Sequence, residues 1–120
     1  GEPFTYVFAS RGGTAWTGPP PTVTPTRDMV IRVQWAGSAY RSGQGYIGWT
    51  PDVDGATLIG DPPVLEAFSQ SGGRHEPIPA AVAHYRVTAG VPFTPRFGTE
   101  YAGTIFNQYD SLRIDIHEVR

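Results

Sequence analysis

The chain has 120 residues, a formal net charge of −2 and no cysteine. That length corresponds to one domain and excludes two-domain enzymes and the (β/α)₈ barrel. Without cysteine there is no disulfide, thiolate zinc site or cysteine nucleophile. All nine basic residues are arginines spread along the chain. A nucleic-acid binder concentrates its basic residues in a stripe, so we expect no nucleic-acid partner.

The composition favours an all-β domain. Fifteen glycines and twelve prolines supply many turns, and charged residues make up only 17% of the chain. The prolines recur every few residues and would interrupt helices. No apolar run reaches the roughly 20 residues that a membrane span needs, so we expect no membrane insertion. The first residue is Gly1 and not Met, which suggests a module cut from a longer parent protein.

Short runs with alternating polarity predict strands along the whole chain. In chain order, the predicted strands are 4–9, 28–36, 45–50, 64–68, 80–88, 93–97, 102–107 and 111–119. In 28–36, Trp35 shares a face with Ile31 and Val33, which indicates a core position. The last run is the most regular, with its leucine and isoleucines on one face. We expect the predicted pair 93–97 and 102–107 to be joined by the turn at 98–100.

Three local features refine this prediction. Asp54-Gly55 predicts a two-residue hairpin between 48–53 and 56–59. Residues 69–79 read as a polar loop, and 80–83 could alternatively form one helical turn. Eight to ten short strands predict an antiparallel β-sandwich or jelly roll. Residues 1–27 would be an N-terminal strand and proline-rich connector packed on a jelly-roll core of residues 28–120.

Residues suited to metal or acid–base chemistry are present without a recognisable motif. Asp52 and Asp54 fit the start of a calcium loop, but the residues after them read as a strand and not as further ligands. The three histidines, His75, His84 and His117, have no metal-ligand spacing, and we expect them to be solvated. Material for a Ser-His-Asp triad also exists, without a Gly-x-Ser-x-Gly elbow. Its members would be Ser69, Ser71 or Ser111 with His75 and Asp110. We therefore expect no enzyme activity and no cofactor.

The aromatic residues are the better functional candidates, because a sugar ring stacks its apolar face on an exposed indole or phenol. Trp16 and Tyr40 lie in predicted loops beside glycine, proline and polar residues. The alternative for such rings is packing in the core or against another subunit. The candidate ligand-binding residues are Trp16, Tyr40, Arg41, Gln44, Tyr46 and Trp49.

Five segments together resemble a known family. They are VIRVQWAGSAY followed by GYIGWTPDVDGATLIG, then AVAHYRVTAGVPFTPRF, YAGTIF and DSLRIDIHEV. Their order is similar to that of the C-terminal jelly-roll domains of phage tail-fibre and minor tail proteins, which are related in turn to tumour-necrosis-factor and complement head domains. The resemblance implies a ten-stranded sandwich, a homotrimer and a place on the virion tail.

A second resemblance is to small bacterial galactose-binding lectins of the β-sandwich type, through TRDMVIRVQWAGSAY. Those lectins bind calcium in a loop near the C-terminus, where this chain has only Asn107 and Asp110. We therefore expect a non-catalytic, receptor-binding or structural module, virion-associated or extracellular, that contacts a host-surface glycan or a neighbouring tail protein. The alternative is a small bacterial carbohydrate-binding lectin.

Overall fold

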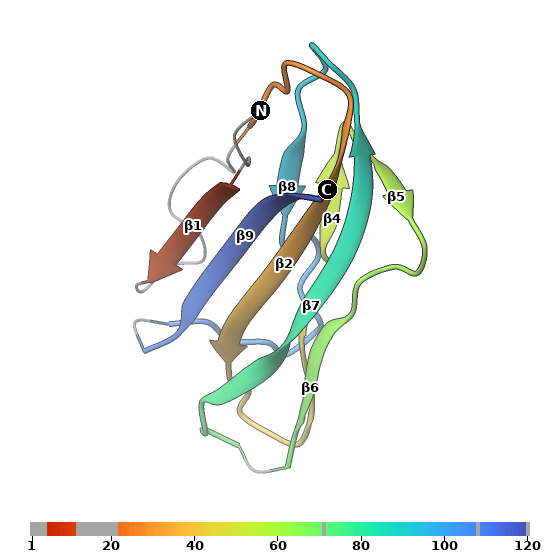
Figure 1. Cartoon of the computed structure of the whole chain (residues 1–120). Coiled ribbons are helices and arrows are strands. Elements are labelled where there is room, and N and C mark those ends of the chain that lie inside the picture. Colours follow the sequence, from red (N-terminus) through yellow and green to blue (C-terminus); the bar gives the residue numbers. More distant parts are fainter. Residues whose placement is uncertain (1–4, 12–21, 71, 108, 120) are drawn as a thin grey trace.

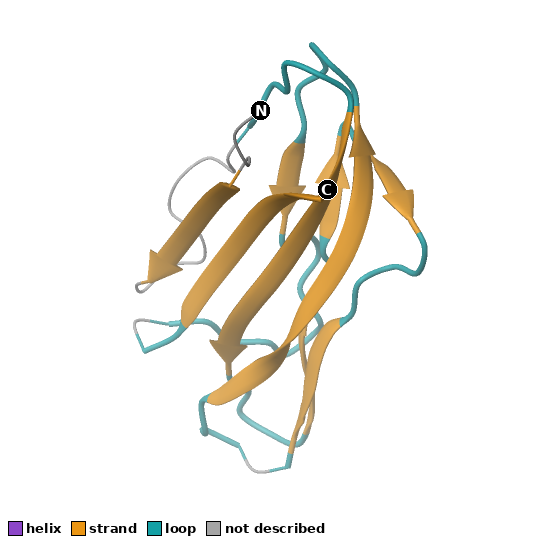
Figure 2. Ribbon diagram, viewed as in Figure 1, coloured by secondary structure: helices purple, strands orange, loops and turns teal. Residues whose placement is uncertain are grey.

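Nine strands make up the regular structure of the computed structural model, which describes residues 5–11, 22–70, 72–107 and 109–119 (Figures 1 and 2). None of these residues forms a helix long and apolar enough to span a membrane. The strands are β1 (Thr5–Arg11), β2 (Met29–Ala39), β3 (Gly45–Trp49), β4 (Asp52–Asp54), β5 (Thr57–Ile59), β6 (Leu65–Ser69), β7 (Glu76–Val87), β8 (Thr94–Arg96) and β9 (Ser111–Val119).

One layer is a five-stranded antiparallel sheet in the order β1-β9-β2-β7-β5. The first strand pairs with β9 along its whole length, from Thr5 opposite His117 to Arg11 opposite Ser111. Alternation along β2 and β9 buries one face of this sheet, as the sequence predicts. Trp35 is fully buried on that face and meets the Tyr85 ring edge-on, with 6.3 Å between ring centroids. The interpretation of Trp35 as a core residue is confirmed.

The second layer consists of the pairs β3–β6 and β4–β8. Isolated bridges extend it, from Val23 to Phe93 and from Trp49 to Glu100. A hydrogen bond joins the two layers, because the indole nitrogen of Trp35 in β2 donates to the carbonyl of Arg96 in β8 at 2.9 Å. From β2 onward the chain passes back and forth between the layers. The expected antiparallel β-sandwich is therefore confirmed, with nine strands among the described residues.

The hairpin predicted at Asp54-Gly55 is wrong. The turn is present, with Gly55 at φ +81°, but β4 pairs with β8 and β5 pairs with β7. The turn therefore connects the two layers of the sandwich. A Cβ at Gly55 would lie 2.2 Å from the carbonyl oxygen of Pro92, so the position needs glycine for both its backbone angle and its close contact.

Two other segments also differ from the prediction. The strand β7 begins at Glu76, so part of the predicted loop and the possible helical turn at 80–83 are strand. The strand β5 pairs only with residues 84–86 of β7, so one edge of the first half of β7 has no described strand partner. Pro77 and Pro79 are tolerated there because proline, which cannot donate a ladder hydrogen bond, is accepted at a sheet edge. Residues 102–107 form a single bridge, at Ile105 with Tyr40, and the expected pair with 93–97 is absent from the described ladders.

Candidate functional site

Three loops meet at the end of the sandwich where β2 finishes (Figure 2). They are the loop after Tyr40, the loop that leads into β7, and the segment from Tyr101 to Asp110. Backbone hydrogen bonds connect them: the amide of Gly73 donates to the carbonyl of Arg41 at 2.8 Å, and the amide of Ile105 donates to the carbonyl of Tyr40 at 2.7 Å. Residues far apart in the sequence are thereby brought into one site.

Asp110 is the centre of this site, and its side chain is fully buried. Its Oδ1 accepts hydrogen bonds from the Ser38 hydroxyl at 2.9 Å and from Nδ1 of His75 at 2.8 Å. Its Oδ2 accepts the backbone amide of Asn107 at 3.0 Å. Because a carboxylate only accepts, the His75 proton is fixed on Nδ1. One buried group thus joins the end of β2, the start of β7 and the loop before β9.

The His75 ring contacts two tyrosine rings. Its centroid is 4.5 Å from that of Tyr40 and 5.7 Å from that of Tyr109. Tyr109 is 67% exposed, and Tyr40 and His75 are half-buried. The amide of Tyr109 donates to the side-chain oxygen of Asn107, which holds the loop that carries the ring. We call these three rings, Tyr40, His75 and Tyr109, the aromatic end.

The chemistry available at Asp110 differs from that of a hydrolase triad. In a triad the imidazole lies between the carboxylate and the nucleophilic hydroxyl. Here the carboxylate lies between the Ser38 hydroxyl and the imidazole of His75, so the hydroxyl is not placed to give its proton to the ring. Ser38 also accepts the backbone amide of Ser111 at 3.2 Å. The arrangement fixes loop geometry and presents aromatic rings.

The guanidinium of Arg41 is directed into the protein's own backbone. Its Nη1 donates to the carbonyls of Ala102 at 2.9 Å and Tyr46 at 3.3 Å. It is packed closely between Gly45 and Gly103, where an added Cβ would lie 2.7 Å and 2.6 Å from guanidinium atoms. Its Nε is buried and has no hydrogen-bond partner among the described residues. Arg41 therefore joins neighbouring loops, with part of its donor capacity left unused.

The other aromatic candidates are placed differently. Tyr46 is 55% exposed on β3 and packs edge-on against Phe68 of β6, with 5.0 Å between ring centroids. Trp49 is only 2% exposed and meets Phe97 in the core, so its indole offers no open surface for stacking. Gln44 is exposed in the loop before β3. Trp16 lies outside the described residues.

The acidic pair proposed for calcium lies on β4. Both side chains are exposed, and Asp54 forms an ion pair with Arg96 of β8. Partial burial and the neighbouring charge of Asp54 raise the pKa of Asp52, and the charge of Arg96 opposes that rise. No group of three or more His, Asp or Glu side chains in the described part of the chain could hold a metal ion. A calcium ion needs about six to eight oxygen ligands, whereas Asp54 has the Arg96 guanidinium as its partner. The described residues therefore do not support a calcium site at Asp52 and Asp54.

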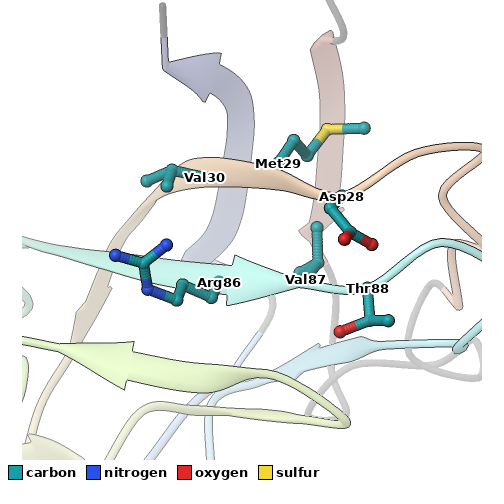
Figure 3. Close-up of a pocket in the computed structure, with 6 residues that line it drawn as sticks. All are labelled: Asp28, Met29, Val30, Arg86, Val87 and Thr88. Atoms are coloured by element: carbon teal, nitrogen blue, oxygen red, sulfur yellow. The ribbon is translucent and has the colours of Figure 1, made fainter.

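A shallow depression of about 250 Å³ lies at the opposite end of β2 (Figure 3). Asp28 on one wall accepts the backbone amide of Ala89 at 2.9 Å. Figure 3 shows the guanidinium of Arg86 on the other side, beside Val30. The lining residues are Asp28, Met29, Val30, Arg86, Val87 and Thr88.

Sequence reasoning identified part of the aromatic end. It singled out Tyr40 for stacking and noted His75 and Asp110 as possible partners. Ser38 as the second donor to Asp110 was missed, and Tyr109 was not singled out as a site residue. The Asn107-x-x-Asp110 spacing was the available signal, because such side chains commonly bond to nearby backbone amides. Comparison of the chain with family models, curated proteins and solved structures finds no match.

Proposed function

We propose that this chain is a non-catalytic binding module whose aromatic end contacts a glycan. One observation carries the proposal: the exposed ring of Tyr109 and the half-buried ring of Tyr40 both contact the ring of His75, which is held by the buried carboxylate of Asp110. Aromatic rings held on fixed loops bind with little loss of conformational entropy. The site is therefore suited to binding and needs no reaction step.

The ligand class follows from the surface chemistry. The apolar face of a pyranose packs against an aromatic ring, while its hydroxyls need donors and acceptors at the edge of that ring. The phenol of Tyr109 and the second ring nitrogen of His75 supply such groups. A shallow site of this kind gives weak binding by itself, because it buries little of the ligand.

The setting we propose is a virion tail, in a homotrimer that attaches to a host-surface glycan or to a neighbouring tail protein. The family resemblance carries this setting, and the all-β sandwich supports it because jelly-roll sandwiches are frequent among viral and lectin domains. Three weak sites on one tip would act together through avidity. Light scattering at high protein concentration tests the assembly: a trimer supports the tail setting, and a strict monomer favours the lectin alternative.

A glycan array followed by calorimetry with the strongest hit tests the binding. Tyr109→Ala should reduce affinity at least tenfold, since it removes the most exposed ring of the aromatic end. Tyr46→Ala is the matched control, because Tyr46 is also an exposed tyrosine but lies on β3 against Phe68. The proposal fails if the array gives no hit, or if the control weakens binding as much as Tyr109→Ala.

A further inference from the structure

The outer face of the five-stranded sheet carries a row of cationic and imidazole side chains. In the ladder, Arg32 of β2 lies opposite His84 of β7 on one side and His117 of β9 on the other. Arg86 lies two residues beyond His84 on the same face of β7. Neighbouring strands are about 4.8 Å apart, so these side chains form one continuous patch. We call Arg32, His84, Arg86 and His117 the basic patch.

Carboxylates are scarce beside this patch. Asp115 is the one acidic residue that the pairing of β2, β7 and β9 places on this face among the described side chains, and Arg113 binds it through three hydrogen bonds of 3.0 to 3.1 Å. Arg32 donates to the amide oxygen of Gln34 at 3.2 Å. Neither Arg32 nor Arg86 forms an ion pair with a described residue. Two guanidinium groups therefore keep most of their donors free on one face of the sheet.

We propose that the basic patch binds an acidic polysaccharide through its sulfate or carboxylate groups. One guanidinium group can donate two parallel hydrogen bonds to two oxygens of the same anionic group. It is also less strongly hydrated than an ammonium group. The row extends across three strands, which suits a linear chain lying over the sheet with its anionic groups in succession. The depression beside Arg86 and Val30 (Figure 3) offers space for a ring substituent next to a cation, and Asp28 on its far wall is engaged by a backbone amide.

The charge of the patch favours a polysaccharide over other polyanions. Protein surfaces that bind nucleic acid neutralise many closely spaced phosphates with basic residues. Polybasic membrane anchors use about four to eight lysines or arginines. This face has two unpaired arginines, and the whole chain has a net charge of −2. The patch is also separate from the aromatic end, because Arg32 and Ser38 are six positions apart along β2, about 20 Å. The inference therefore stands independently of the proposed function.

Binding to immobilised heparin, which carries sulfate, and to alginate, which carries carboxylate, tests the proposal with the intact chain. Arg32→Gln and Arg86→Gln should each lower affinity about fivefold to tenfold, and each should reduce the dependence of log affinity on log salt by roughly one. Arg74→Gln is the matched control, because Arg74 is exposed in the loop before β7, has no ion pair among the described residues and lies off this face. Its effect should be less than twofold.

The outcomes separate the possibilities. Preference for heparin over alginate assigns the site to sulfate, and the reverse assigns it to carboxylate. Equal losses for Arg74→Gln and Arg32→Gln would overturn the proposal, because the attraction would then depend on total charge. Absence of binding at low salt, or equal binding to single-stranded DNA or anionic lipid vesicles, would overturn it as well. Tyr109→Ala should leave heparin binding unchanged, which distinguishes this surface from the aromatic end.

Discussion

Replacing Asp110 should destabilise the whole domain, although the residue lies in a loop at one end. In Asp110→Ala, the Ser38 hydroxyl, the His75 ring N–H and the Asn107 amide lose their shared acceptor. Each lost hydrogen bond costs on the order of 1 kcal/mol, so we expect a loss of about 3 kcal/mol in the free energy of unfolding. In a domain of this size that corresponds to a fall in Tm of roughly 9–15 °C.

Urea unfolding at pH 7 measures this change directly. Asp61→Ala is the control, because Asp61 is an exposed aspartate in the turn after β5, and a surface change of this kind stays within about 0.5 kcal/mol. Asp110→Asn keeps the volume and one acceptor oxygen, so its loss should lie between the two. If Asp110→Ala is no more destabilising than Asp61→Ala, Asp110 does not hold the three loops together and the account of the aromatic end is wrong.

Two further predictions concern the core. Trp35→Phe removes the hydrogen bond from the indole to the Arg96 carbonyl and leaves a small void between the layers. The free energy of unfolding, measured by urea titration, should therefore fall by about 2–3 kcal/mol. A fall of less than about 1 kcal/mol would mean that this contact contributes little. Burial and then the charge of Asp52 raise the pKa of Tyr85 to about 12, and the protonated phenol is therefore favoured in the folded state. The associated stability is complete below pH 10 and is lost as the pH rises towards 12, so between pH 9 and 11 the parent should lose on the order of 1 kcal/mol more than Tyr85→Phe. Equal losses in the two proteins would contradict the assignment.

The sequence predicts the strands best where one face is continuously buried. The run 111–119 becomes β9 with the predicted bounds, because Leu112, Ile114 and Ile116 alternate without interruption. Turn chemistry is less informative, since Asp54-Gly55 specifies a tight turn but not which strands pair on either side of it. That choice depends on contacts between distant segments, such as β4 with β8.

The candidate site shows the same limit. Residue types and loop positions identified Tyr40, His75 and Asp110 as chemically capable. His75 and Asp110 are 35 positions apart in the sequence. They come into contact only because three loops pack together at this end of the sandwich. Ser38 carries no signal of its own, because it lies near the end of a strand among small residues. The fold class was therefore predictable from local patterns, whereas the geometry of the site required the tertiary structure.

The packing of Arg41 against Gly45 and Gly103 constrains how this chain can diverge. Both glycines have positive φ, +151° and +88°, so they disfavour other residues whether or not the guanidinium is present. Descendants that lose the arginine should therefore retain the glycines, whereas descendants that gain a side chain at either glycine cannot retain the arginine in its present position. The position of Arg41 therefore depends on the two glycines, whereas the glycines do not depend on Arg41. Arg41 can thus change before Gly45 or Gly103 does, but neither glycine can change while Arg41 keeps its position.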